Sequence, residues 1–452
     1  DFGMVRVSAV QRRFKQNLSK QTNTLLGAWI PIGLHEIKLS WVKADLSGRV
    51  GAATIDANDA SQIGLGYIGL PTAAILANHG VEVVGVDVSK KAVDTINKGK
   101  IHIVEPDLEA LVHSAVMSGK LKAVLKPEKA EVFIIAVPTP FKENHKPDLS
   151  YVEAAAKSIA PVLEKGNLVI LESTSPVGTT EKLAKWLPKL DLHIAYCPER
   201  VLPGHILREI VGNDRIIGGL TPTSGEKAKQ LYQIFVKGEC LTTDARTAEM
   251  TKLTENAFRD VNIAFANELS LICEELKINV WELIKLANRH PRVKILQPGP
   301  GVGGHCIAVD PWFIVDSAPH LARLIRTSRE VNDSKPHYVL AQVKAKLSHL
   351  ENPTVACLGL SFKADIDDIR ESPALEIVRE LAKEKANLLV VEPHLETLPP
   401  QLNLPHIKLT DMHEAVEQAD LIVLLVNHRK FANIDCTLLK NKQIIDTRGL
   451  WL

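Results

Sequence analysis

The sequence has no excess of charge of either sign and no long hydrophobic run. It contains 54 Lys and Arg residues against 53 Asp and Glu residues, a formal net charge of +1 over 452 residues. A balanced chain has no overall field to attract nucleic acid or an anionic membrane, so a phosphate site must be local. No apolar run approaches the ~18 residues of a spanning helix, and the layout of a secretory signal is missing. We therefore expect neither nucleic acid nor membrane as a partner.

Cysteine is scarce and unpaired. The six cysteines are Cys197, Cys240, Cys273, Cys306, Cys357 and Cys436. They form no C-x-x-C pair and lack the even spacing of a disulfide framework, which is typical of a protein of the reducing cytoplasm. No grouping of cysteine and histidine has the spacing of a zinc site, so no metal is expected. We expect a soluble, cytoplasmic protein.

What is present is an ordinary globular composition, 45% hydrophobic and 24% charged. The length suggests about three domains. The predicted fold is α/β, with two Rossmann-like doubly wound domains joined by a long central helix. Residues 1–60 form an atypical extension without sustained periodicity, and 61–220 a dinucleotide-binding domain. A central helical region for catalysis and dimerisation is expected over 221–330, and a second nucleotide-binding domain over 331–452.

A glycine-rich turn opens the regular part of the sequence. It reads Gly64-Leu65-Gly66-Tyr67-Ile68-Gly69, and a helical run over 71–79 and an apolar strand over 81–86 follow it. Such glycines allow a tight turn and close approach to a pyrophosphate at a helix N-terminus. The strand ends at Asp87, whose carboxylate can bind ribose hydroxyls and repels a 2′-phosphate. The spacing therefore predicts NAD rather than NADP.

The strand that should precede this turn is missing from the pattern. Residues 56–62 are polar and poor in β-branched residues, whereas the first strand of such a fold is normally buried. Either the strand is degraded, or the beginning of the chain is not native to the rest of the protein. Unrelated sequence joined at about residue 60 would explain both the polar strand and the irregular extension.

Polar residues follow three further predicted strands, over 132–137, 168–171 and 194–196. They are Thr139, Ser173, Thr174 and Glu199. The carboxyl ends of parallel strands line the ligand crevice of an open sheet, so we expect these side chains to face the cofactor or the reacting group. Ser173 and Thr174 could equally be helix caps, whereas Glu199 has nothing to cap.

One long helix is predicted over 247–288. Its polar residues at spacings i, i+3, i+4 and i+7 share one face: Lys252, Glu255, Asn256 and Arg259. Such a face is usually solvated. The apolar run over 263–266 indicates instead that the helix is buried, where Lys252 and Asn256 could hold a substrate oxygen and a water.

A second glycine-rich turn, over 299–304, delivers Cys306 and, four residues later, Asp310. Glycines allow close approach by another molecule, and a thiol among free backbone N–H groups can attack a carbonyl carbon. The alternative is a buried structural thiol. The rest of the chain favours a nucleophile.

A second α/β pattern follows residue 329. Strands are predicted over 355–360, 388–391 and 421–426, and a helix over 373–385. This half has the plan of the first without its glycine fingerprint. Lys363 and Arg370 flank an acidic loop, a natural place for a diphosphate held by side chains. Two such folds predict two nucleotide ligands, one in each domain, with the reacting atoms located between them.

Together the motifs resemble the UDP-glucose/GDP-mannose dehydrogenase family of UDP-sugar 6-dehydrogenases, from about residue 63 to the C-terminus. Three runs carry the resemblance in the family's order. They are Cys197-Pro198-Glu199-Arg200-Val201-Leu202-Pro203-Gly204, Arg289-His290-Pro291-Arg292, and Gly303-Gly304-His305-Cys306-Ile307-Ala308-Val309-Asp310-Pro311-Trp312-Phe313.

The resemblance implies a set of site residues. The catalytic residues would be the nucleophile Cys306 with Lys252, Asn256, Asp310, Glu199 and Thr139. NAD would be bound by Gly64, Gly66, Tyr67, Ile68, Gly69, Asp87, Thr139 and Thr174. The sugar nucleotide would be bound by Arg200, Val201, Lys252, Asn256, Arg259, Gly303, Lys363 and Arg370, with Arg289 or Arg292 reaching across a homodimer.

The resemblance also implies a four-electron oxidation. NAD⁺ would accept a hydride from C6 of the sugar while Lys252, Asp310 and a water handle the hydroxyl proton. Cys306 would add to the aldehyde, a second hydride would leave a thioester, and a water activated by Glu199 or Asp310 would hydrolyse it. The motifs favour UDP-N-acetyl-D-mannosamine as substrate, and synthesis of a surface polysaccharide such as enterobacterial common antigen as pathway.

Other interpretations stay open at this stage. The substrate could be UDP-N-acetylglucosamine or UDP-glucose. A simple hydroxyacid dehydrogenase would share the domain plan but would have no use for Cys306. A poor first strand could also displace the phosphate turn, which would leave a nucleotide-sugar binder with impaired catalysis.

Overall fold

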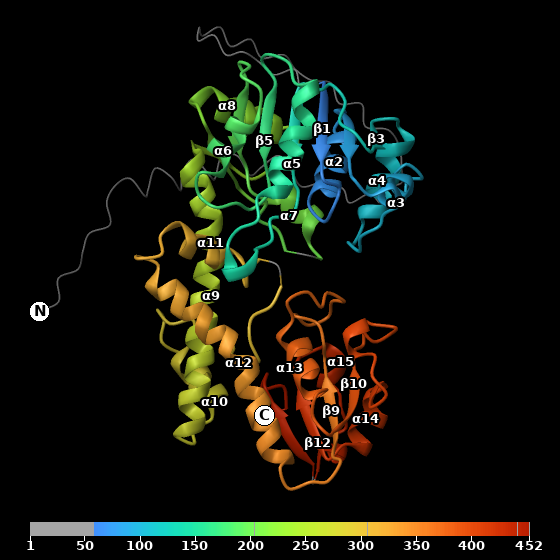
Figure 1. Cartoon of the computed structure of the whole chain (residues 1–452), viewed down its shortest axis with the longest axis vertical. Helices are drawn as coiled ribbons and strands as arrows, with labels where there is room; N and C mark the ends of the chain where they lie inside the picture. Colours follow the sequence, from blue (N-terminus) through green and yellow to red (C-terminus); the bar gives the residue numbers. More distant parts are fainter. Residues whose placement is uncertain (1–57, 203, 305, 441, 452) are drawn as a thin grey trace, which may run out of the picture. The chain divides into compact units, whose positions relative to one another are not determined.

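The computed structural model describes residues 58–202, 204–304, 306–440 and 442–451. The fold is that of the second of two units into which the chain divides, residues 54–452 (Figure 1). The extension predicted over 1–60 lies almost entirely outside the described residues.

The first domain is built on an eight-stranded sheet with the order β3-β2-β1-β4-β5-β6-β7-β8. The strands are β1 Asp59–Ile63, β2 Glu82–Val86, β3 Leu121–Val124, β4 Val132–Ile135, β5 Leu168–Leu171, β6 His193–Tyr196, β7 Arg215–Gly219 and β8 Cys240–Asp244. Neighbouring strands are parallel except β6 and β7, which are antiparallel. The start of β7 therefore lies at the edge where β4, β5 and β6 end.

Helices cover both faces of this sheet (Figure 1). They are α2 Gly69–Asn78, α3 Lys90–Ile96, α4 Leu108–Met117, α5 Ser150–Ile159, α6 Thr179–Trp186, α7 Ile206–Gly212 and α8 Pro222–Tyr232, with 3₁₀ turns η1 Glu143–His145 and η2 Ala160–Val162. One hydrophobic cluster joins the sheet to α2, α4, α7 and α8, and another joins it to α5 and α6. The predicted doubly wound α/β fold is confirmed.

Strand β1 is present and has a polar sequence, as expected of the first of the two alternatives, a degraded strand. It pairs in parallel with β2 and β4 at the centre of the sheet, because the backbone ladder forms whatever the side chains are. The side chains do not suit that place. Ser61 and Gln62 are fully buried, and neither the Ser61 hydroxyl nor the Gln62 amide has a hydrogen-bond partner among the described residues.

The central region contains α9 Ala245–Glu275, α10 Val280–Ala287, α11 Asp310–Ser317 and α12 Arg323–Leu347. The single helix predicted over 247–288 is wrong, because Lys277 takes a left-handed φ of 56° that ends it. Asn279 then caps α10 by accepting hydrogen bonds from the backbone N–H groups of Trp281 and Glu282. Two long helices, α9 and α12, thus connect the domains in place of one.

Buried polar contacts fix α9 against α12. The guanidinium of Arg329 on α12 donates to Asp260 on α9 at 2.6 Å, and the two side chains are 2% and 0% exposed. Asn332 donates to Asp260 at 2.8 Å and accepts from Asn267 at 2.8 Å. Because an unpaired charge there would be costly, these contacts favour one register of the two helices.

The second domain is a five-stranded parallel sheet with the order β11-β10-β9-β12-β13. Its strands are β9 Thr354–Leu358, β10 Asn387–Val391, β11 Ile407–Leu409, β12 Leu421–Leu424 and β13 Gln443–Asp446. Its helices are α13 Pro373–Leu381, α14 Met412–Gln418, α15 Arg429–Ala432 and α16 Cys436–Leu439, with a 3₁₀ turn, η3 Pro400–Leu402.

The two domains share a turn after their central strands. Gly64 after β1 and Gly359 after β9 both have left-handed φ values, 90° and 97°. In the first domain Asp87 accepts from the N–H of Leu65 at 3.0 Å, and in the second Glu392 accepts from the N–H of Leu360 at 2.7 Å. The second domain thus keeps the first glycine of the fingerprint and its acid.

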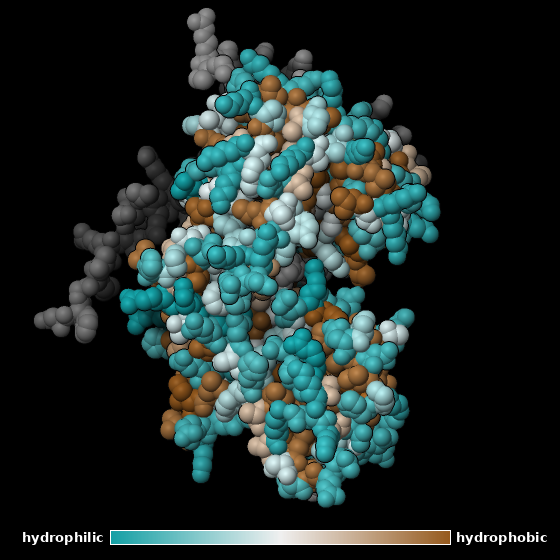
Figure 2. All heavy atoms as spheres, in the orientation of Figure 1, coloured by the Kyte–Doolittle hydropathy of each residue, from teal (hydrophilic) through white to brown (hydrophobic). Residues whose placement is uncertain are grey.

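The face of the molecule in Figure 2 carries mainly hydrophilic residues, with hydrophobic residues scattered among them. Over the described residues, none of the helices combines the length and the apolar character needed to cross a membrane.

Replacing the unpartnered polar groups of β1 should stabilise the protein. We expect Ser61→Ala and Gln62→Leu each to raise the free energy of unfolding by about 1–2 kcal/mol, because a buried polar atom without a partner loses its hydration. Chemical denaturation measures this. Ser89→Ala is the matched control, since the Ser89 hydroxyl caps α3 and its loss should lower stability by about 1 kcal/mol. Destabilisation by both β1 variants would show that the two side chains are satisfied.

Candidate active site

The glycine turn after β1 has the shape of a dinucleotide site. A Cβ on Gly64 would lie 2.6 Å from the carbonyl oxygen of Ala136, and one on Gly69 would lie 1.8 Å from that of Gly64. A Cβ on Gly66 would meet nothing within 4 Å. The first and third glycines are therefore required by the fold, while the second leaves its backbone open to a ligand.

Asp87 braces the same turn. Its carboxylate accepts from the backbone N–H of Leu65 at 3.0 Å and of Ser89 at 2.8 Å, and the side chain is half-buried. A carboxylate has lone pairs beyond two hydrogen bonds, so ribose hydroxyls can still bind. No described side chain caps the N-terminus of α2, so its N–H groups can receive a pyrophosphate. These residues fit NAD, which Gly66, Tyr67, Ile68 and Asp87 would hold.

The predicted threonines at the ends of β4 and β5 are in contact. The Thr139 hydroxyl donates to the carbonyl oxygen of Thr174 at 2.6 Å, and both residues are half-buried. The hydroxyl of Ser173, by contrast, is buried and directed at the carbonyl of Ile135 at 3.4 Å. Thr139 and Thr174 are thus joined at the edge of the sheet where the ligand is expected. Ser173 instead contacts the backbone of the neighbouring strand β4.

Four predicted catalytic residues come together between α9 and α11. Lys252 and Asn256 lie one turn apart on α9 and are 8% and 9% exposed, and Asp310, 2% exposed, begins α11. Asn256 donates to the carboxylate of Asp310 at 2.5 Å. The backbone N–H of Asp310 donates to the carbonyl oxygen of Cys306 at 2.8 Å, which joins the predicted nucleophile to the acid.

Burial governs the protonation of this set. It raises the pKa of Asp310 to about 6, against the opposing effects of Lys252 and Asn256. Burial also raises the pKa of the Cys306 thiol to about 11, with Asp310 adding to the rise and Lys252 and Arg370 opposing it. Cys306 is therefore a neutral thiol at pH 7 that must lose its proton as it reacts.

The glycines before Cys306 are explained by contact with the chain itself. A Cβ on Gly303 would lie 2.4 Å from the carbonyl oxygen of Glu371, and one on Gly304 would lie 2.9 Å from the Phe362 ring. Gly304 also donates its N–H to the carbonyl of Arg370 at 3.2 Å. The close approach expected at this turn is made by the second domain, so these glycines need no ligand to account for them. His305 lies outside the described residues.

The predicted sugar-nucleotide residues are more dispersed. Arg200 is bound to Glu255 on α9 at 2.6 Å, and Val201 packs on the core of the first domain. Arg370 donates to Asp368 at 2.6 Å, and its guanidinium lies 5.8 Å from the centre of the Tyr67 ring. The remaining four are exposed: Arg259, Arg289, Arg292 and Lys363. Arg259 therefore does not share the burial of Lys252 and Asn256.

Sequence analysis missed the partner of Glu199. Glu199 is 9% exposed and accepts from the guanidinium of Arg215 at 2.6 Å, and Arg215 also donates to Glu172 at 3.3 Å. The available signal was a charged residue at the start of an apolar strand, Arg215 before Ile216 and Ile217. Only the reversal of β7 brings it to the ligand edge.

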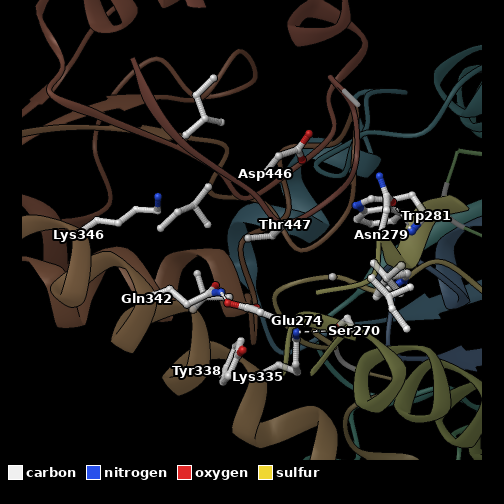
Figure 3. A pocket seen from close by; sticks show the side chains of 17 residues that line it. Ser270, Glu274, Asn279, Trp281, Lys335, Tyr338, Gln342, Lys346, Asp446 and Thr447 are labelled. Carbon is white, nitrogen blue, oxygen red and sulfur yellow. Dashed lines mark hydrogen bonds between the residues drawn. The ribbon is translucent and has the colours of Figure 1, made fainter. Parts of the chain in front are cut away.

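A separate cavity of about 390 Å³ is lined by residues of α9, α10, α12 and β13 (Figure 3). Among the described residues that line it, none belongs to the predicted site. The Lys335 ammonium is buried and donates to the Ser270 hydroxyl at 2.8 Å, and burial lowers the pKa of Lys335 to about 8. Gln342 donates to Glu274 at 2.5 Å. These polar groups thus form hydrogen bonds with one another across the cavity wall.

A group of histidine and carboxylate side chains in the second domain resembles a metal site, but the ring nitrogens of His428 make hydrogen bonds within the protein. Asp365, His394 and His428 have ligand atoms close enough to share an ion. Nδ1 of His428 accepts from the N–H of Asp365 at 2.9 Å, and Nε2 lies 3.2 Å from Glu392. With both ring nitrogens engaged in these contacts, His428 has no lone pair for a metal.

A thiol beside a buried lysine, asparagine and aspartate, with a dinucleotide turn on the neighbouring sheet, suits a nicotinamide-dependent dehydrogenase that carries its substrate on cysteine. Comparison with known families agrees. Three models of the UDP-glucose/GDP-mannose dehydrogenase family match in order: the NAD binding domain at 59–236, the central domain at 246–334 and the UDP binding domain at 356–451.

Individual relatives are matched by this chain over nearly their whole length. The chain is 61% identical to an NDP-N-acetyl-D-galactosaminuronic acid dehydrogenase of Ralstonia nicotianae, over 88% of this chain and 98% of that protein. It is 61% identical to a UDP-N-acetyl-D-mannosamine dehydrogenase of Campylobacter jejuni, over 83% and 97%. A solved UDP-N-acetyl-mannosamine dehydrogenase of Staphylococcus aureus superimposes with a TM-score of 0.79 at 45% identity, over 87% and 95%.

The chain therefore belongs to the UDP-glucose/GDP-mannose dehydrogenase family. It is an oxidoreductase of the class of NAD-dependent UDP-sugar dehydrogenases, with an NAD binding domain before the central helices and a UDP binding domain after them.

Charge substitutions beside Cys306 should shift its reactivity in opposite directions. With the pKa of the thiol at about 11, we expect alkylation by iodoacetamide to rise about tenfold per pH unit from 7 to 10 without a plateau. Asp310→Asn removes a negative charge and should displace the curve to lower pH, whereas Lys252→Met should displace it to higher pH. Mass spectrometry of the Cys306 peptide follows the reaction. Identical curves for the two variants would contradict this electrostatic assignment.

Proposed function

We propose that the protein oxidises C6 of UDP-N-acetyl-D-mannosamine to give UDP-N-acetyl-D-mannosaminuronate, with two NAD⁺ reduced per sugar. The observation that carries the proposal is the thiol of Cys306 next to the buried set of Lys252, Asn256 and Asp310. A single oxidation of an alcohol needs no thiol. A thiol is needed to hold an aldehyde for a second oxidation.

In the first oxidation, the buried set manages the proton of the C6 hydroxyl. When bound, NAD⁺ supplies the hydride acceptor for both oxidations. Asn256 fixes the carboxylate of Asp310 at 2.5 Å, so a hydroxyl or an ordered water meets a base of defined position. Lys252, 8% exposed on the same face of α9, donates to the oxygen and stabilises negative charge on it.

In the second stage, Cys306 forms and releases a covalent intermediate. Its sulfur adds to the C6 aldehyde and its proton passes to a base of the site, which gives a thiohemiacetal. Loss of a hydride from C6 and of the hydroxyl proton gives a thioester. Glu199 then takes a proton from water as the oxygen adds to the carbonyl carbon, and returns that proton to sulfur as the C–S bond breaks. The thiol of Cys306 is restored, and the uronic acid is released and ionises to the uronate.

The identity of the sugar rests on the relatives. Proteins named UDP-N-acetyl-D-mannosamine dehydrogenase from Campylobacter jejuni, Yersinia pestis and Escherichia coli are 61%, 58% and 56% identical to this chain. The second candidate substrate is a nucleoside-diphosphate N-acetyl-D-galactosamine, favoured by the Ralstonia relatives that are named NDP-N-acetyl-D-galactosaminuronic acid dehydrogenase. We infer a cytoplasmic enzyme, since Cys306 must remain a reduced thiol. From the family resemblance we infer a role in surface-polysaccharide synthesis.

We also propose a homodimer formed through α9. Phe258, Phe265 and Ile272 lie seven residues apart on this helix and are 67%, 53% and 46% exposed. That spacing puts them on one side of the helix, and large side chains so exposed favour burial against a second copy. The exposed Arg289 and Arg292 would then be available to the partner's sugar-nucleotide site.

The stoichiometry of NADH tests the reaction. With UDP-N-acetyl-D-mannosamine limiting, we expect two NADH per sugar, and with Cys306→Ala at most one, because the aldehyde has no thiol to carry it. Absorbance at 340 nm measures both. UDP-N-acetyl-D-galactosamine, UDP-N-acetylglucosamine and UDP-glucose serve as competing substrates, and a higher kcat/KM for any of them would replace the proposed sugar. One NADH per sugar from the unaltered protein would rule out the four-electron reaction.

Charges on the exposed side of α9 should separate the dimer. We expect Phe258→Glu with Phe265→Glu to yield a monomer in sedimentation equilibrium, because two buried carboxylates would lack partners. The matched control is Leu321→Glu, a substitution of an 85% exposed leucine elsewhere on the surface. An unaltered assembly in the double variant, or a monomeric unaltered protein, would contradict an interface on α9.

A further inference from the structure

The reversed strand of the first sheet carries an arginine to the ligand edge. Because β7 is antiparallel to β6, with Ala195 opposite Gly219, its first residue lies beside the segment that follows β6. That first residue is Arg215, and the segment contains Cys197 and Glu199. A parallel strand in this place would have put its first residue at the opposite edge.

Arg215 joins two carboxylates away from water. Its Nη2 donates to Oε2 of Glu199 at 2.6 Å, and its Nη1 donates to Oε1 of Glu172 at 3.3 Å. Arg215 is 3% exposed, Glu172 2% and Glu199 9%. The guanidinium lies 4.4 Å from the centre of the Tyr232 ring, and the Tyr232 hydroxyl donates to Glu172 at 2.9 Å.

The charges of this group do not balance when both carboxylates are ionised. One guanidinium faces two acids, and Oε2 of Glu172 has no hydrogen-bond partner among the described residues. Burial raises the pKa of Glu172 to about 7, with Glu199 adding to the rise and Arg215 and Tyr232 opposing it. The groups that face Glu172 are Arg215 from β7, Glu199 and Cys197 after β6, and Tyr232 from α8. Glu172 is therefore the acid of the group that changes charge near neutral pH.

We propose that Arg215 is a positioning residue that aims Glu199 at the water that hydrolyses the thioester, and that Glu172 adjusts the strength of this hold. The proposal rests on the role given to Glu199 in the proposed function. The other oxygen of Glu199 accepts from the N–H of Arg200 at 2.7 Å, so both oxygens are fixed while lone pairs remain for water.

The charge of Glu172 affects the proton transfer from water to Glu199 during thioester hydrolysis. Glu199 takes the proton of water as the oxygen adds to the thioester carbon and sulfur leaves. An ionised Glu172 competes for the guanidinium and adds negative charge nearby, which makes Glu199 a stronger base. When Glu172 is neutral, Glu199 is the only charged partner of Arg215 in this group. Hydrolysis should therefore accelerate as pH rises through the ionisation of Glu172.

Rapid mixing of the intact protein with NAD⁺ and UDP-N-acetyl-D-mannosamine tests the positioning. We expect Arg215→Met to form a burst of two NADH per site with kcat/KM for the sugar nucleotide unchanged, but to lose about 10²-fold in kcat, because a misplaced base slows only hydrolysis, which follows both oxidations. Arg215→Lys should recover part of the loss. The control is Arg246→Met, which removes an arginine from an exposed pair with Glu181 and should turn over normally.

The pH profile of turnover tests Glu172. We expect the rise centred near pH 7 in the unaltered protein to be lost in Glu172→Gln, which keeps the shape of the side chain and cannot ionise. Turnover of Arg215→Met equal to that of the unaltered protein, or an unchanged pH rise in Glu172→Gln, would overturn the inference. If Arg215→Met does not fold, Arg215→Lys and Glu172→Gln decide. Fewer than two NADH per sugar from the unaltered protein would instead contradict the proposed function.

Discussion

A carboxylate removed from water, that of Asp310, is the constraint on which the site depends. A buried charge is tolerated only where it is paired and hydrogen-bonded. Asn256 donates to it and Lys252 faces it, one helical turn apart on α9. Since α11 begins at Asp310, this contact fixes α11 against α9 and, through the backbone of Asp310, fixes Cys306. The position of Cys306 thus follows from one buried acid. The pKa of its thiol is raised first by its own burial and then by the charge of Asp310.

The second constraint is the close packing of the turn before Cys306. Gly303 and Gly304 leave no room for a Cβ against Glu371 and Phe362, so the second domain holds the turn in place. The same loop of the second domain brings Arg370 to the ring of Tyr67, in the NAD-binding turn. Cys306, the expected cofactor turn and the UDP binding domain therefore meet within one continuous set of contacts.

Local patterns in the sequence predicted much of this arrangement. The turn at Gly64, the strand before Asp87 and the Lys252 and Asn256 pair follow from spacing alone, because turns and helix faces are set by neighbours in sequence. The break at Lys277 was missed since a left-handed lysine carries little sequence signal. Strand β1 gave only a weak signal in the sequence because Ser61 and Gln62 have poor strand propensity, which sheet pairing overrides. Arg215 was missed because strand direction is a property of the fold.

The proposed reaction requires above all that the substrate becomes covalently attached to Cys306. The decisive measurement is mass spectrometry of the Cys306 peptide from a Glu199→Gln variant, quenched after mixing with NAD⁺ and UDP-N-acetyl-D-mannosamine. We expect the peptide to carry the mass of the sugar-nucleotide acyl group, because hydrolysis is blocked after both oxidations. Formation of two NADH per site with an unmodified Cys306 peptide would contradict it.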